Sequence, residues 1–274
     1  MIVNALTIDL EEWFCVSNFA GTIRQEDWPS MESRIERSTN SLLELLGSRG
    51  TKATFFVLGW VAERHPEMIR SIAGEGHELA SHGYGHQLVY DLTPEAFRED
   101  LSKSLAIIEE ISGVRCKGYR APSFSIRQDM DWFWQILAEF GISYDSSIYP
   151  VSHDRYGDPY APRFPFEVDV QGSALLEIPL STISQFGKNL PVAGGGYLRL
   201  YPTWLTTWAI RRIQKEGHPA VVYLHPWEID PEQPRPQVSK AKLFRHRVGI
   251  RSMRSKLDRL LNEFHFGSME DVFL

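Results

Sequence analysis

Short apolar runs alternate with amphipathic segments along most of the chain, which is the pattern of an α/β fold with a parallel sheet. The apolar runs predict buried strands at residues 2–9, 53–58, 77–80, 116–119, 142–145, 175–179 and 219–224. The amphipathic segments predict helices at about 35–46, 61–73, 93–111, 129–140 and 203–215. Seven strands of parallel-sheet character favour a barrel or an open doubly wound sheet.

Two segments depart from this alternation. Residues 149–172 are rich in proline and aromatic residues and have no periodicity of their own, so they are expected either to line the rim of a cleft or to form an ordered covering loop. The basic tail from Lys240 carries apolar residues at helical spacing between Ile250 and Leu261. We therefore predict a main domain at 1–230 and a helical extension at 231–274 that packs on it.

Composition narrows the class of protein without changing this fold. The 274 residues are 43% hydrophobic and 23% charged, as expected for one large globular α/β domain. A net charge of −6 argues against binding to nucleic acid phosphates. The N-terminal apolar run has no basic region before it and stops at Asp9, which predicts neither a signal peptide nor a transmembrane segment and favours a cytoplasmic location.

Ionisable residues stand at the ends of most predicted strands. In parallel α/β folds the carboxyl ends of the strands meet at one edge, which is where active sites form. The residues at these ends are Asp9 with Glu11 and Glu12, His82 with His86, Arg120, Asp145 and His225. This convergence predicts a catalytic centre at that edge.

The segment Ser-His-Gly-Tyr-Gly-His at 81–86 suggests a metal site. Two imidazoles four residues apart can bind one cation if the chain between them curls, and Gly83 and Gly85 permit such a curl. The alternative is a surface loop that carries two histidines by chance. Two imidazoles and one carboxylate suit Zn²⁺ in a hydrolytic site, although ligand type does not distinguish Zn²⁺ from Co²⁺, Ni²⁺ or Fe²⁺.

These positions resemble the polysaccharide deacetylases of the NodB homology type, carbohydrate esterase 4. Five family motifs occur in order: residues 7–12 resemble the first, 81–86 the second, 120–124 the third, 144–147 weakly the fourth, and 224–226 the fifth. The Asp-Leu-Glu-Glu-Trp start and the Gly-Gly-Gly-Tyr segment at 194–197 are most similar to deacetylases of exosortase-associated exopolysaccharide loci. The resemblance implies a distorted (β/α)7-type barrel that removes N-acetyl groups from amino sugars.

The resemblance also implies roles for individual residues. Asp9 would be the catalytic base and His225 the acid that protonates the departing amine. His82, His86 and an acidic residue would hold the metal. The backbone N–H after Pro122, that of Ser123, would bind the carbonyl oxygen.

Four further positions would support this machinery. Arg120 and Asp145 would tether Asp9 and His225, or each other, while Leu224 and Trp227 would wall the acetyl pocket. The adjacent aspartates usual in the family are replaced by Asp-Leu-Glu-Glu, so the third metal ligand is Glu11 or Glu12. Residues two apart on a strand share a face, which favours Glu11.

The expected partner is an amino-sugar glycan or its lipid-linked precursor, and a homo-oligomer is compatible with the sequence. One alternative is another C–N hydrolase on the same barrel, which would cleave a small amide such as a ureide or deformylate an amino sugar. A second is a glycan-binding module without chemistry. The presence of a usable residue at every proton-transfer and ligand position disfavours the binding module.

Overall fold

A computed structural model describes residues 2–153, 156–192 and 194–274. The chain divides into two compact units, one formed by Met1–Ala53 with Ala193–Leu274 and the other by Thr54–Val192. We call these the terminal unit and the central unit. Each is described by itself.

Strand β1 (Asn4–Leu10) forms the core of the terminal unit, and all seven of its residues are buried. β10 (Val221–Leu224) pairs with it in parallel, with Ile8 opposite Leu224. β11 (Phe266–Gly267) pairs in parallel with the start of β1. The predicted strands at 2–9 and 219–224 are confirmed. β11 was not predicted, because a strand of two residues is too short to give a periodic pattern in the sequence.

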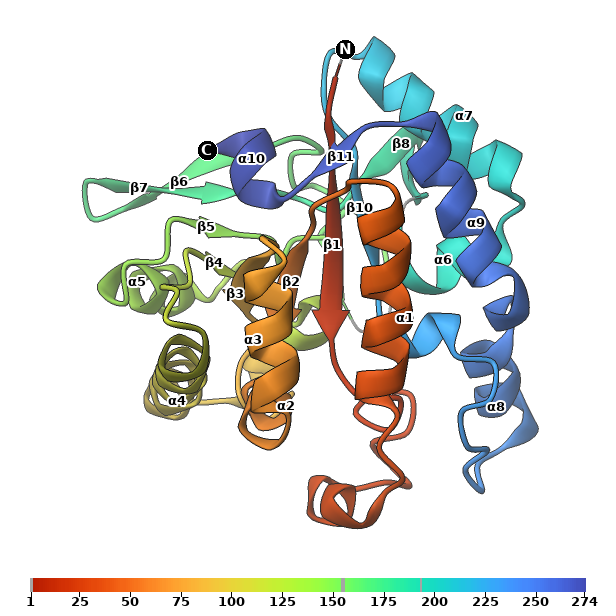
Figure 1. The fold of residues 1–274 in the computed structure, drawn as a ribbon. Helices are drawn as coiled ribbons and strands as arrows, with labels where there is room; N and C mark the ends of the chain where they lie inside the picture. The colour runs from red at the N-terminus through yellow and green to blue at the C-terminus, as the bar shows by residue number, and fades with distance from the viewer. Residues whose placement is uncertain (1, 154–155, 193) are drawn as a thin grey trace. The chain divides into compact units, whose positions relative to one another are not determined.

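Helices surround these strands in the terminal unit. They are α1 (Ile35–Ser48), α6 (Gly195–Leu200), α7 (Thr203–Lys215), α8 (Lys240–Arg247), α9 (Ile250–Glu263) and α10 (Met269–Phe273), with 3₁₀ turns η1 (Gln25–Ser30) and η4 (Pro226–Ile229). α9 packs against α6, α7 and η4, and Figure 1 shows it beside α7. The apolar stripe that predicted this helix is buried in those contacts.

The central unit contains a mostly parallel sheet. Its strands follow the order β2 (Thr54–Val57), β3 (Glu78–Ser81), β4 (Gly118–Tyr119), β5 (Tyr144–Asp145), β7 (Ser173–Glu177) and β6 (Phe166–Val170), the last antiparallel to β7. A separate hairpin joins β8 (Thr182–Gln185) and β9 (Lys188–Pro191). The strands predicted between 53 and 179 are present, with bounds shifted by a few residues.

Two expectations for this unit need correction. The segment 149–172 is not loop throughout, because Phe166–Val170 alternates side chains between two faces and forms β6; residues 154–155 lie outside the described part. The single helix expected at 61–73 is two helices, α2 (Gly59–Arg64) and α3 (Pro66–Gly74). Proline disfavours helical geometry in the residue before it, and the break lies at His65.

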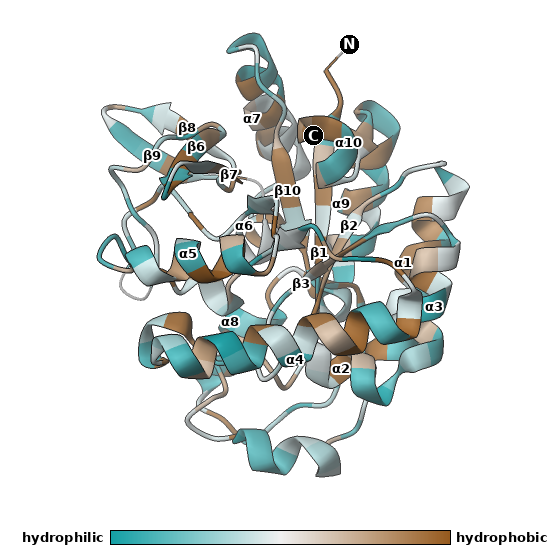
Figure 2. Ribbon diagram, turned by 90° about the vertical axis from the view of Figure 1, so that its left-hand side faces the viewer, coloured by the Kyte–Doolittle hydropathy of each residue, from teal (hydrophilic) through white to brown (hydrophobic). Residues whose placement is uncertain are grey.

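Helices α4 (Pro94–Ser112) and α5 (Asp131–Glu139) cover the central sheet with the short 3₁₀ turns η2 (Val89–Asp91) and η3 (Pro122–Phe124). Thr93 caps the N-terminus of α4, since its hydroxyl accepts a hydrogen bond from the Ala96 amide. α4 buries an apolar stripe that includes Phe97 and Leu101, and Figure 2 shows hydrophobic and hydrophilic residues alternating along it. Among the residues the structure describes, no helix is both long and apolar enough to span a membrane.

Candidate active site

Three carboxylates lie at the end of β1, and the structure separates their roles. Asp9, Glu11 and Glu12 are each 2% exposed or less. Glu12 accepts hydrogen bonds from the amides of Arg34 (3.1 Å) and Ile35 (3.3 Å) and from the Ser33 hydroxyl. Because these groups begin α1, Glu12 serves as the anionic partner of a helix N-terminus.

His225, directly after β10, faces the other two carboxylates. Its Nε2 lies 3.3 Å from Oε1 of Glu11 and 3.9 Å from Oδ2 of Asp9. Burial alone lowers the pKa of an imidazole, but here the charge of Glu11 and a hydrogen bond to Glu228 outweigh it and raise the pKa of His225 to about 9. The ring is therefore protonated at neutral pH and can donate a proton.

Glu228 is a site residue that the sequence reasoning missed. Its Oε2 lies 3.2 Å from His225 Nδ1 and accepts from the His225 backbone amide at 3.0 Å, while its Oε1 accepts from Arg199 Nε at 2.6 Å. Burial by itself raises the pKa of this carboxyl, but the Arg199 and His225 charges lower it to about 2. A carboxylate three residues after His225 in a capping-box arrangement was the available signal.

Trp227 lies between two imidazoles. Its ring stacks on His225 at a centroid distance of 5.0 Å and on His246 at 4.4 Å, and its Nε1 approaches Oε1 of Glu11 at 3.4 Å. Leu224, also predicted as a wall residue, is fully buried at the end of β10. In the terminal unit the fold thus gathers the predicted Asp9, Glu11, His225 and Trp227.

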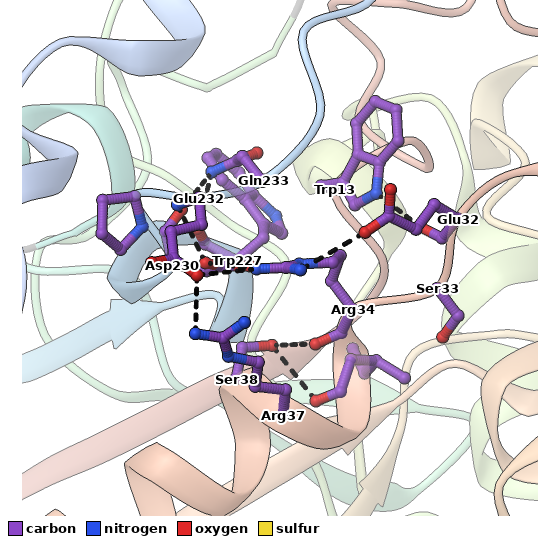
Figure 3. Close-up of polar contacts among 12 residues, drawn as sticks. Trp13, Glu32, Ser33, Arg34, Arg37, Ser38, Trp227, Asp230, Glu232 and Gln233 are labelled. Atoms are coloured by element: carbon purple, nitrogen blue, oxygen red, sulfur yellow. Dashed lines mark hydrogen bonds and ion pairs between the residues drawn. The ribbon is translucent and has the colours of Figure 1, made fainter.

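An ion pair between the half-buried Arg34 and the buried Asp230 lies at the end of the turn that carries these residues. Arg34 donates to both carboxylate oxygens of Asp230, at 2.8 and 3.1 Å, from the start of α1 (Figure 3). Arg37 reaches the neighbouring Glu232 at 2.6 Å. These contacts link α1 to the end of η4, consistent with the packing of the two elements.

His246 makes the stability of this unit sensitive to acid. Its Nε2 bonds Gln233 Oε1 at 2.6 Å, and burial together with the charge of Arg199 lowers its pKa to about 3. A histidine whose pKa falls on folding contributes stability that is present above pH 6.5 and is lost as the pH falls toward 3. The pKa of His246 thus differs by roughly 3.5 between the unfolded and the folded protein, which corresponds to at most about 5 kcal/mol of folding stability.

We expect the free energy of unfolding, measured with urea at pH 4 and pH 7, to change less with pH in His246→Phe than in the wild type. An equal change in both proteins would contradict the assignment of this pH dependence to His246.

The histidine loop lies in the central unit, after β3. His82 is 2% exposed and its Nδ1 bonds the Arg120 carbonyl at 2.7 Å, which fixes the orientation of the ring. His86 has a φ of 52°, which is uncommon for a residue other than glycine, and the two imidazole centroids are 5.5 Å apart. The predicted curl that brings the two rings together is confirmed.

Asp100 on α4 holds this loop and was not foreseen. Its carboxylate accepts from the amides of Tyr84 (2.8 Å) and Gly85 (3.1 Å). Burial raises its pKa, although these hydrogen bonds act in the opposite direction. The histidine pair is therefore supported by a helix as well as by its own strand.

Gly83 is required where the loop meets Asp100. It has a φ of 72°, and a Cβ there would lie 2.7 Å from Asp100 Oδ2. We expect Gly83→Ala to destabilise the protein by more than the ~1–2 kcal/mol of left-handed strain alone. Gly113→Ala is the matched control, because its φ is 70° and nothing lies within 4 Å of the added atom. An equal loss of unfolding free energy in Gly83→Ala and Gly113→Ala, measured with urea, would mean that the close approach to Asp100 does not affect stability.

Arg120 and Asp145 are both fully buried in the central unit. Arg120 donates to the Ser146 carbonyl at 3.1 Å, whereas Asp145 accepts from the Ser147 hydroxyl at 2.7 Å. Asp145 also shares a hydrogen bond with Glu177, opposite it on β7; burial, the larger effect, raises its pKa to about 6 and that of Glu177 well above normal. Burial and the charge of Asp145 both act on Glu177 in this direction, and the sequence reasoning missed this pairing.

The predicted oxyanion segment forms a strained turn. Pro122 begins η3, and Ser123 and Phe124 follow with φ values of 53° and 54°. The preceding Ala121 amide donates to Ser147 Oγ at 2.7 Å. Two consecutive left-handed residues are costly and are typical of functional turns.

A pocket of about 630 Å³ adjoins this turn within the central unit. Aromatic side chains on its wall include Phe124, Trp134 and Tyr160, and polar ones include Gln128 and Asp158. Gln128 Nε2 donates to Asp158 at 2.6 Å. Residues 157–162, which are part of the segment 149–172, supply much of the lining of this cavity.

Comparison with known protein families divides the chain at about residue 145. Residues 26–144 match the family described as polysaccharide deacetylase, and residues 146–274 match a domain of unknown function, DUF3473. A peptidoglycan-N-acetylglucosamine deacetylase of Bacillus cereus is 32% identical over 97 residues, which are 35% of this chain and 34% of the relative. The chain thus spans about a third of the length of that relative.

Two solved structures share the fold. A polysaccharide deacetylase from Mycobacterium smegmatis, described as putative, aligns with a TM-score of 0.65 and 23% identity over 98% of this chain and 87% of its own. Puue allantoinase aligns with a TM-score of 0.62 and 16% identity, over 99% and 88%. The predicted fold class, an α/β barrel of the deacetylase kind, is confirmed by these similarities.

Proposed function

We propose that this chain, whose residues 26–144 match the polysaccharide deacetylase family, hydrolyses N-acetyl groups on amino sugars of a glycan. The observation that carries the proposal is the arrangement of His225, whose Nε2 faces Asp9 and Glu11 while Nδ1 is held by Glu228. An imidazole that is protonated and oriented toward acidic groups is suited to donate a proton to a leaving amine.

We propose that a divalent metal, Zn²⁺ before Co²⁺, Ni²⁺ or Fe²⁺, is bound by Glu11, His82 and His86. The donor set of two imidazoles and one carboxylate fits a catalytic metal with open positions. The engagement of Glu12 by α1 supports Glu11 over Glu12. When bound, the metal supplies a Lewis acid that polarises the acetyl carbonyl and makes a water more acidic.

The remaining roles belong to side chains and backbone of the chain itself. Asp9 accepts the proton of the attacking water, and His225 Nε2 gives its proton to the amine nitrogen as the C–N bond breaks. The Ser123 N–H binds the developing negative charge on the carbonyl oxygen. Trp227 and Leu224 exclude water beside the acetyl methyl group, while Arg120 and Asp145 support the edge that carries Ser123.

The test is metal analysis of the purified protein beside acetate release from N-acetylglucosamine oligomers, with and without chelator. About one metal per chain and chelator-sensitive acetate release support the proposal. Bound metal with hydrolysis of ureides, but not of acetylated sugars, would instead support the alternative of a small-amide hydrolase. The fold is compatible with this alternative, because Puue allantoinase has a similar fold. Absence of metal would contradict the ligand assignment.

We also propose that the pocket beside Phe124 contacts further sugars of the glycan. Tyr160 is 89% exposed on its wall, and aromatic faces combined with amide and carboxylate groups suit the mixed surface of a sugar. Tyr160→Ala is expected to raise KM for a hexamer about 3- to 10-fold with kcat unchanged, as loss of ~1 kcal/mol of stacking implies. Phe186→Ala, 94% exposed on the β8–β9 hairpin, is the control, and equal effects of both would contradict the proposal.

A further inference from the structure

We infer that Glu228 and Arg199 are positioning residues for His225, and that the region of unknown function thereby supplies both the proton donor and its support. This rests on the proposed function, in which His225 is the acid. The family resemblance attributes such support to Arg120 or Asp145. Neither Glu228 nor Arg199 belongs to the five motifs, and both lie in residues 146–274.

The two oxygens of Glu228 perform different tasks. Oε2 bonds both the Nδ1 and the backbone amide of His225, so the carboxylate fixes the ring relative to its own main chain. Oε1 accepts a hydrogen bond from Arg199 Nε at 2.6 Å. With Nδ1–H held in this way, Nε2 is the nitrogen presented to Asp9 and Glu11 and the one that can release its proton.

Arg199 is itself anchored by the C-terminal helices. Its Nη1 donates to the carbonyls of His246 (2.6 Å) and Val248 (2.9 Å), which lie at the end of α8 and just after it. Its own carbonyl accepts from Lys256 on α9 at 2.6 Å. The guanidinium therefore has a fixed position from which to orient Glu228.

Burial distinguishes this array from an ordinary surface ion pair. The side chains of Glu228 and Arg199 are 0% and 5% exposed, whereas that of His225 is 17% exposed. A buried ion pair contributes little net stability because desolvation offsets the attraction, so stability alone is a weak reason for it. The exposed end of the array is the imidazole, as expected if the pair serves that ring.

The test compares three variants by kcat, KM, metal content and Tm. Glu228→Gln is expected to lower kcat by roughly 10- to 100-fold with KM and metal content unchanged, and Glu228→Asp should recover part of the loss. Asp230→Asn is the control, because it breaks the partly buried pair with Arg34 at the end of the same turn (Figure 3). Equal loss of kcat in Glu228→Gln and Asp230→Asn at equal loss of Tm would overturn the inference.

A second measurement needs no substrate and so separates this inference from the proposed function. In the protein as purified, the hydrogen-bonded Nδ1 proton of His225 should give a slowly exchanging downfield ¹H resonance. Assignment uses a His225→Gln variant, in which the resonance is absent. Its loss in Glu228→Gln and retention in Asp230→Asn support the inference even if acetylated sugars are not hydrolysed. Retention in Glu228→Gln would overturn it.

Discussion

Asp9→Asn is expected to retain its metal and lose roughly 10²- to 10⁴-fold in kcat, the usual contribution of a general base. The substitution keeps the size of a side chain that is 2% exposed, so the buried end of β1 should remain packed. It removes the basic oxygen while leaving the proposed ligand Glu11 in place. The measurements are steady-state acetate release and metal content of the same sample.

Glu12→Gln is the matched control for Asp9→Asn. Glu12 is equally buried and lies three residues further on, but its hydrogen bonds go to the start of α1. We expect this variant to lose stability while kcat stays within a few-fold of wild type. Full activity in Asp9→Asn would remove Asp9 as the base.

His82→Ala is expected to lose both metal and activity, with acetate release reduced to background. His82 is one of the two imidazoles of the proposed site, and its Nδ1 contact to the Arg120 carbonyl sets the ring for binding through Nε2. Loss of one of three protein ligands lowers affinity enough for metal to be lost during purification. Metal content and activity are measured before and after added zinc.

The control for His82→Ala is His77→Ala, which removes another buried imidazole just before β3. His77 packs against Phe55 at a centroid distance of 5.2 Å and takes no part in the proposed site. Its loss should lower Tm and leave about one metal per chain. Full metal content in His82→Ala would show that the histidine loop is not the metal site.

The strands that carry the site were predictable because burial on both faces leaves a continuous apolar run, as in β1, and an ionisable residue then marks the strand end. The curl of 81–86 was predictable from its glycines. Glycine permits a left-handed turn, and Gly83 adopts one.

The supporting residues were not predictable from local pattern. Asp100 and Arg199 stand on helices, where a charged residue normally faces solvent, and only the fold turns them toward a loop or a carboxylate. Glu177 on a strand was similarly inconspicuous, because its significance depends on Asp145 lying opposite it. Such contacts join residues 15 to 32 positions apart and leave no periodic signal.

The pairing of β1 with β10 and β11 affects how the protein can be synthesised. Ala5 pairs with Val221, and Asn4 pairs with Phe266, so more than 200 residues are synthesised between the first strand and either of these partners. Until they emerge, β1 lacks both partners and exposes backbone and apolar groups that are prone to aggregation. We expect stalled nascent chains that lack residues 221–267 to require chaperones and to release no acetate, whereas chains extended beyond residue 267 should no longer require chaperones.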